Sequence, residues 1–304
     1  MREENIFDCP EKLLIRDIGF RLACAYDDEQ FYALNTLFSV TRKKVTSQLS
    51  LSYILSLLNS LFISKYFRER FEGAHIGSNY LRFKPLYTTQ LPIRRVHFTT
   101  PKSERKKMFD ALAAQYENGQ DTALLVQVEH LLPKDADGTF LAFKPSATGN
   151  EEHSDVVHDL LAYLAERMID LNKDKRSEMK RFLGWLEGAL HIKPNNKGEE
   201  GLDALTGKSK LRNYLGDYQK EEAELSFAEL EDILFKNRTR LGVSLNDARF
   251  KAKLQNEYEM SIARLRPIKQ ELARTDALID QIVYRLYGLT EEEVSVVEGK
   301  AAEE

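Results

Sequence analysis

The sequence predicts an α+β protein that is predominantly helical, with a small antiparallel β meander and a helix first and long antiparallel helices after them. Residues 13–40 hold three apolar-rich segments separated by turn residues, as short strands do. Residues 155–172 and 250–286 place apolar side chains at the helical period. No apolar run reaches the roughly 18 residues that cross a bilayer, so a soluble protein without a membrane helix is expected.

The expected strands lie close together near the start of the sequence. They cover residues 13–18, 21–26 and 31–40, with Gly19 after the first and the turn cluster at 27–30 before the third. Sheets usually have about four to six strands. We therefore expect this meander to be part of a larger domain.

A helix is expected from Ser52 to about Arg70. Its apolar side chains recur at helical spacing, and Lys65, Arg68 and Arg70 fall in its last turns. Cations suit the negative end of the helix dipole. They are therefore expected there without any bound ligand, and the helix alone indicates no site.

Residues 74–109 combine cations with aromatic rings. Eight Lys or Arg side chains are interleaved with four rings, those of Tyr80, Phe83, Tyr87 and Phe98. Pro85 and Pro92 favour extended backbone, so these side chains are expected on loops or edges and not on a packed helix. Thr100 and Pro101 then predict a helix that runs to about Tyr116.

Charge is distributed unevenly along the chain. The formal net charge is −4, yet residues 31–109 carry 14 Lys or Arg against three acids, Glu69, Glu72 and Glu104. Residues 111–304 carry 26 Lys or Arg against 36 Asp or Glu. A basic segment attached to an acidic one is typical of a module that binds a polyanion. A basic surface that is merely solvated would give the same pattern.

The second half of the chain is expected to be helical with one interruption. Residues 155–190 and 247–287 predict two long helices able to pair antiparallel. Capping-box spacing, in which a Ser or Thr precedes a Glu by three residues, marks two further helix starts, Ser226/Glu229 and Thr290/Glu293. The chain is therefore divided into four regions: 1–98, a helical spacer with an insertion at 99–192, a loop or linker at 193–225, and a helical region at 226–304.

Catalytic and metal-binding motifs are not found in the sequence. No Gly-x-Gly-x-x-Gly or Walker-type glycine loop occurs. The run DKRSEMK at 174–180 resembles a nuclease metal site, but it lies in a charged helix, where Glu and Lys form a solvated face. Cys9 and Cys24 are expected as free thiols in a reducing cytoplasm. We expect no catalytic centre and no metal site in this chain.

Two motifs and the tail of the chain resemble one family. Leu58-Asn59-Ser60 lies in the helix expected at 52–70, and Leu91-Pro92-Ile93 follows in the basic segment. The tail sequence LIDQIVYRLYGLTEEEVSVVEG occupies residues 278–299. This ordered combination resembles the C-terminal target-recognition region of type IIG restriction-modification enzymes and adenine-specific DNA methyltransferases. It is more distantly similar to the specificity subunits of type I restriction systems. Residues 118–225 are covered only loosely.

The resemblance implies that residues 1–98 are a partial DNA target-recognition domain, half of a complete one, and that spacer helices follow. It implies sequence-specific recognition of double-stranded DNA together with, or split from, a methyltransferase or nuclease partner. The Asn/Asp-Pro-Pro-Tyr/Phe motif of amino-methyltransferases is absent from the sequence. S-adenosylmethionine and Mg²⁺ are therefore implied only for the partner or parent enzyme.

Such a domain needs cations for DNA phosphates and a few polar side chains for base edges. The phosphate candidates are Arg42, Lys43, Lys44, Lys65, Arg68, Arg82, Lys84, Arg94 and Arg95. The candidate base readers are Asn79, Arg82 and Gln90. Neutralising roughly six to ten phosphates would give a log–log salt slope of about −5 to −9. The alternative interpretation is a helical scaffold that binds protein partners and carries an incidental basic patch.

Overall fold

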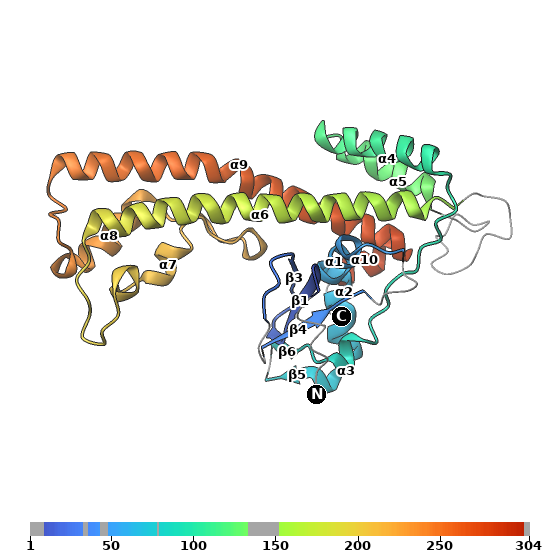
Figure 1. Ribbon diagram of the computed structural model, residues 1–304, viewed down its shortest axis with the longest axis horizontal. Coiled ribbons are helices and arrows are strands. Elements are labelled where there is room, and N and C mark those ends of the chain that lie inside the picture. Colours follow the sequence, from blue (N-terminus) through green and yellow to red (C-terminus); the bar gives the residue numbers. More distant parts are fainter. Residues whose placement is uncertain (1–8, 33–35, 43–47, 78, 133–151, 301–304) are drawn as a thin grey trace. The chain divides into compact units, whose positions relative to one another are not determined.

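The computed structural model describes residues 9–32, 36–42, 48–77, 79–132 and 152–300 (Figure 1). The chain divides into two compact units. Unit 1 comprises Met1–Arg167 with Asp276–Glu304, and unit 2 comprises Met168–Thr275. Two long helices, α6 (Ser154–Leu190) and α9 (Ala248–Tyr287), each continue from one unit into the other.

Unit 1 contains two three-stranded antiparallel sheets among its described residues. Sheet A has the order β3-β1-β4, formed by Cys24–Asp27, Lys12–Arg16 and Leu37–Val40. The first strand therefore lies between the other two, and the expected meander order is wrong. Lys12 and Asp27 are opposite each other in this sheet and form a buried ion pair of 3.0 Å.

Sheet B has the order β2-β6-β5, formed by Ile18–Gly19, Tyr80–Arg82 and His75–Ile76. Asp17 joins the sheets, because it is the only residue between β1 and β2. Its N–H donates to the carbonyl of Thr36 at 2.9 Å, and its carbonyl accepts from the N–H of Phe83 at 2.7 Å. The single segment expected at 13–18 thus contributes to two sheets.

The helices of unit 1 begin after sheet A, and β5 and β6 of sheet B lie between η2 and α3 in the chain. They are α1 (Leu51–Asn59), α2 (Leu61–Arg70), the 3-10 helix η2 (Glu72–Ala74), α3 (Pro85–Thr88), α4 (Lys102–Glu117), α5 (Asp121–Leu131), the first part of α6, the end of α9 and α10 (Glu291–Val297). The helix expected at 52–70 is divided at Ser60, whose side chain caps the N-terminus of α2 by accepting from the N–H of Ile63. Leu13, Ile15, Leu57, Phe67 and Phe83 are among the buried residues beneath these elements.

Unit 2 is built around the paired parts of α6 and α9, with α7 (Lys208–Arg212) and α8 (Phe227–Lys236) packed near them (Figure 1). Three 3-10 helices complete its regular elements: η3 (Gly201–Ala204), η4 (Tyr218–Lys220) and η5 (Arg238–Arg240). Leu202, Leu211 and Tyr214 are buried in the same apolar cluster as Phe182 and Leu186. Residues 193–225 are therefore a packed part of unit 2, in contrast to the expected loop or linker.

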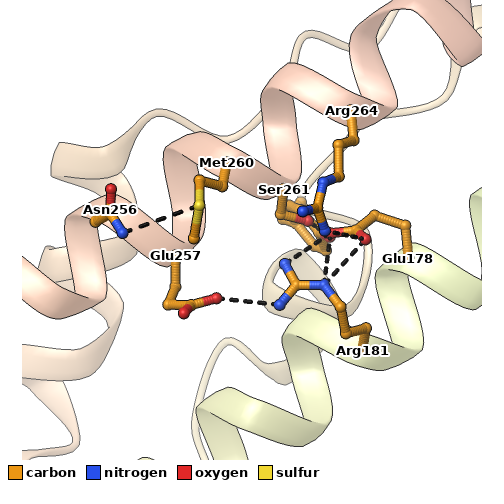
Figure 2. Close-up of polar contacts among 8 residues, drawn as sticks. Glu178, Arg181, Asn256, Glu257, Met260, Ser261 and Arg264 are labelled. Carbon is orange, nitrogen blue, oxygen red and sulfur yellow. Dashed lines mark hydrogen bonds and ion pairs between the residues drawn. The ribbon is translucent and has the colours of Figure 1, made fainter.

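Polar contacts also join α6 to α9 within unit 2 (Figure 2). Glu178 accepts from Arg181 at 2.8 Å and from Arg264 at 3.2 Å, and Arg181 reaches Glu257 at 3.0 Å. Burial opposes ionisation of Glu178, but the hydrogen bonds from Arg181, Ser261 and Arg264 outweigh it and lower its pKa. Glu178 thus contributes to helix pairing, and the expectation that it lies on a solvated face is wrong.

The α+β, helix-dominated fold class is confirmed. Both capping boxes form, at Ser226 with Glu229 and at Thr290 with Glu293. Helix α9 continues through Pro267, in agreement with the single long helix expected at 247–287. Within the described residues, no helix combines the length and apolar character needed to span a membrane.

Candidate nucleic-acid interface

The Leu58-Asn59-Ser60 motif connects the helices to sheet A. The side-chain amide of Asn59 donates to the carbonyl of Cys24 at 3.0 Å, and its oxygen accepts from the N–H of Cys24 at 2.8 Å. Cys24 begins β3, which is at the edge of sheet A. Asn59 therefore satisfies the backbone groups that a neighbouring strand would otherwise bind.

The C-terminal tail packs against this same part of unit 1. A carboxylate oxygen of Asp280 on α9 accepts from the N–H of Leu61 at 2.8 Å, which is in the first turn of α2. Burial is the main cause that raises the pKa of Asp280 to about 7. The tail motif is therefore part of the packing of unit 1, although more than 200 residues separate it from α2 in the sequence.

The Leu91-Pro92-Ile93 motif is held by the end of α9. The hydroxyl of Tyr287 donates to the carbonyl of Pro92 and accepts from the N–H of Arg94 at 3.2 Å. Burial also raises the pKa of Tyr287 to about 12, which keeps this hydroxyl protonated. The segment after α3 is thus fixed in place by a residue of the tail.

Arg94 is an interior residue and not a surface cation. Its side chain is 3% exposed, and its guanidinium donates to the carbonyl of Leu286 and to Glu152 at 3.3 Å. Its carbonyl accepts from Tyr53 at 3.2 Å. A phosphate would have to displace these buried contacts to reach the guanidinium. We therefore remove Arg94 from the candidate phosphate contacts.

Arg68 connects the end of α2 to sheet B. Its guanidinium donates to the carbonyls of Phe20 at 2.6 Å and Asn79 at 3.4 Å. His75 in turn bonds the carbonyl of Arg68 at 2.9 Å. The structure thus brings two predicted site residues, Arg68 and Asn79, into contact, with Arg68 bonded to the backbone just after β2 and just before β6.

Three of the predicted cations are exposed near or after sheet B. Arg82 is on β6 and pairs with Asp17 at 3.4 Å. Lys84 and Arg95 are exposed, and neither side chain makes a hydrogen bond or ion pair with another described residue. These two cations are available to a ligand without the loss of an internal ion pair.

Two of the remaining predicted cations are paired with acids on the surface. Arg42 follows β4 and pairs with Glu11, and Lys65 pairs with Glu69 one helical turn away at 3.0 Å. Such surface pairs contribute about 0–1 kcal/mol, so DNA phosphates can compete with them. Lys43 and Lys44 lie outside the described residues.

The predicted base readers are all exposed. Asn79 precedes β6 and Arg82 ends it, while Gln90 follows α3 and donates to the carbonyl of Leu86 at 2.6 Å. Of the four aromatic residues interleaved with cations, only Tyr80 is exposed. Phe83 is buried against Phe67, with a ring-centroid distance of 4.8 Å.

Sequence reasoning missed an exposed apolar set on sheet B. Ile18, Phe20 and Ile76 are exposed there beside Tyr80. The alternation of polar and apolar residues in Tyr80-Leu81-Arg82 could have indicated this exposed face. Leu81 is fully buried, so its two neighbours on the strand point to the other face. Within the described residues, no group of three or more His, Cys, Asp or Glu side chains is placed to hold a metal ion.

Unit 1 is thus an α+β unit with exposed cations and polar side chains near sheet B, as in a polyanion-binding domain. Comparison with known families identifies it more closely. Residues 1–93 match the TaqI-like C-terminal specificity domain, which confirms the resemblance drawn from the two motifs. This part of the chain is similar to a specificity domain, consistent with the C-terminal target-recognition domain of type II restriction-modification enzymes.

Residues 155–283 match a second family, a domain of unknown function named DUF8810. This match spans all of unit 2 and parts of α6 and α9 in unit 1. Neither the curated proteins nor the solved structures compared with the chain give a significant match.

Proposed function

We propose that this protein recognises a specific sequence in double-stranded DNA for a restriction-modification system and acts with a catalytic partner. The observation that carries the proposal is the match of residues 1–93 to a specificity domain, in which Asn79, Arg82 and Lys84 are all exposed. Exposed cations supply affinity for phosphates, and polar side chains read base edges.

The partner in this proposal is an adenine-specific methyltransferase, or a methyltransferase joined to a nuclease as in type IIG enzymes. It would bind S-adenosylmethionine and, for cleavage, Mg²⁺, and this chain would select the DNA site. The assembly would work in the cytoplasm, where the DNA and the cofactor are present.

Selection from a random duplex library tests the proposal. The full chain alone, the partner methyltransferase subunit alone and the two together are each used to select duplexes. We expect the chain, alone or with its partner, to enrich one family of related sequences that the partner alone does not enrich. Unchanged random pools with and without the chain would contradict the proposal.

A helical scaffold that binds protein is the second candidate function. Phe235 on α8 is 53% exposed and lines a hollow of unit 2 in which apolar side chains such as Leu245 and Phe250 lie among charged ones such as Glu231 and Lys251. The scaffold interpretation requires no enrichment of any duplex. The same selection therefore separates the two functions.

A further inference from the structure

The exposed face of sheet B carries apolar rings as well as a cation. Ile18 is opposite Arg82 in the pairing of β2 with β6, and Ile76 is opposite Tyr80 in the pairing of β5 with β6. Residues directly opposite each other share a face, and Phe20 lies two residues beyond Ile18. We call the face formed by Ile18, Phe20, Ile76, Tyr80 and Arg82 the ring face.

Phe20 and Tyr80 form the centre of the ring face. Their ring centroids are 4.1 Å apart, and 52% and 46% of these residues are exposed. Single exposed apolar residues are ordinary, but a contiguous exposed set marks an interaction surface. The opposite side of the sheet is already used, since Leu81 is fully buried there.

The backbone at both rings is held in place. Arg68 donates to the carbonyl of Phe20 and to that of Asn79, the neighbour of Tyr80, and its own carbonyl bonds His75. One arginine at the end of α2 therefore binds the backbone at Phe20 and next to Tyr80. An ordered pair of rings loses less conformational freedom on binding than mobile ones.

The charges around the ring face indicate the kind of ligand. Arg82 is part of the face, Lys84 follows two residues later, and the sequence contains no Asp or Glu from Gly73 to Ser103. The acid nearest to Arg82 is Asp17, at 3.4 Å. A positively charged surface with flat apolar groups at its centre is complementary to a ligand that combines phosphates with bases.

We propose that the ring face contacts the bases of duplex DNA, with Phe20 and Tyr80 touching base edges or a base step while Arg82 and Lys84 contact the flanking phosphates. Aromatic side chains read the methyl group of thymine or insert at a flexible base step. This inference rests on the proposed function and adds the surface and the kind of contact. The rings are neutral, so they contribute to affinity without releasing counterions.

The double variant Phe20→Ala/Tyr80→Ala of the full chain tests this assignment. Its affinity is measured by fluorescence anisotropy at several salt concentrations, for the duplex selected by the wild-type chain and for a scrambled duplex. The matched control is Phe235→Ala, because Phe235 is an equally exposed phenylalanine of unit 2 (53%). Circular dichroism verifies that each variant is folded.

We expect the ring variant to bind the selected duplex about tenfold or more weakly, with the slope of log K against log salt unchanged. The scrambled duplex should lose less affinity, and Phe235→Ala should behave as the wild type. Unchanged affinity for the selected duplex, or a loss that comes with a shallower slope, would overturn the assignment of the rings. Failure of the wild-type chain to bind either duplex, both alone and together with its methyltransferase partner, would instead overturn the proposed function.

Discussion

Asn59 lies at the junction of α1 and α2 and bonds both backbone groups of Cys24. Ser60 caps α2, and Asp280 accepts from the next N–H, that of Leu61. Two adjacent polar side chains and a third from near the other end of the sequence thus meet at one point of unit 1. Each satisfies backbone groups that would be costly to leave unpaired in the interior.

Asn59→Ala removes both hydrogen bonds to Cys24 and should destabilise the edge of sheet A. We expect the local opening free energy of β3 to fall by about 1–3 kcal/mol. Hydrogen–deuterium exchange of peptides covering residues 22–27 measures this change. Asn118→Ala, at an exposed helix end, is the control. Equal exchange of β3 in Asn59→Ala and the wild type would contradict the structural role of the motif.

Asp280 should make stability depend on pH, because burial raises its pKa to about 7 in the folded protein from about 3.9 in an unfolded chain. Its contribution is fully present below about pH 4 and is lost as pH rises through 7. Asp276 and Glu298 raise the same pKa, whereas Arg21 and the N–H of Leu61 lower it.

Asp280→Asn cannot ionise but keeps an oxygen for the N–H of Leu61. We therefore expect it to be more stable than the wild type at pH 8, by an amount of the order of a few kcal/mol, and by a clearly smaller amount at pH 5, where part of the wild-type contribution remains. Urea unfolding at both pH values measures the difference, with exposed Asp110→Asn as the control. A difference between Asp280→Asn and wild type that is the same at pH 5 and pH 8 would exclude this titration.

At the scale of elements, polar contacts reinforce the apolar pairing of α6 and α9. Glu178 accepts from Arg181 on α6 and from Arg264 on α9, so one carboxylate binds an arginine of each helix (Figure 2). In the same unit, the hydroxyls of Tyr214 and Ser261 share a buried hydrogen bond of 2.7 Å. The pairing within unit 2 therefore has a specified register as well as an apolar core.

Glu178→Ala should destabilise unit 2 by about 1–2 kcal/mol, because it leaves two arginines without their shared partner while both are partly exposed. Trp185, the only tryptophan, belongs to unit 2, so its fluorescence during urea unfolding reports on this unit. Glu259→Ala on α9 removes a carboxylate bonded only to Gln255 within its own helix and should change little. Equal midpoints for the two variants would contradict the role of the network.

The sequence predicted the elements well where the signal is local. The apolar period of α6 and α9 and both capping boxes depend on residues within a few turns, and all of them form. The order of sheet A was not predictable from strand signals, because β1 can pair on either side with equal ease. Residues 193–225 were predicted to be a linker because glycines and polar residues outnumber the apolar ones there. The few apolar side chains, among them Leu202 and Tyr214, are nevertheless buried in the core of unit 2.

The candidate site was predicted only in part, for a similar reason. Charge and loop position suggested exposure for Arg82, Lys84 and Arg95, and these residues are exposed. The same criteria failed for Arg94, whose burial depends on the return of Tyr287 and Leu286 from the other end of the chain. Contacts at such sequence separations leave no periodic signal in either segment.

At the scale of the whole molecule, the net charge of −4 is the sum of a basic segment at 31–109 and an acidic remainder of the chain. DNA affinity should depend on this segment and not on the total charge. Lys84→Ala/Arg95→Ala removes two exposed cations without breaking an ion pair of the described residues. We expect weaker binding to every duplex and a log–log salt slope shallower by about 2. Lys197→Ala/Lys210→Ala, with two exposed lysines of unit 2, is the charge-matched control and should keep the wild-type slope.

The salt dependence of duplex binding by the wild-type chain tests the central claim most directly. Arg68 is bonded to two backbone carbonyls, and Arg42, Lys65, Arg82, Lys84 and Arg95 are the other described candidates for phosphate contacts. Counterion release from about five phosphates predicts that log K falls linearly with log salt, with a slope of about −3 to −6. Anisotropy titrations with the selected duplex, between low and physiological salt, measure the slope. A slope near zero, or no binding at any salt concentration, would contradict a DNA-facing specificity domain.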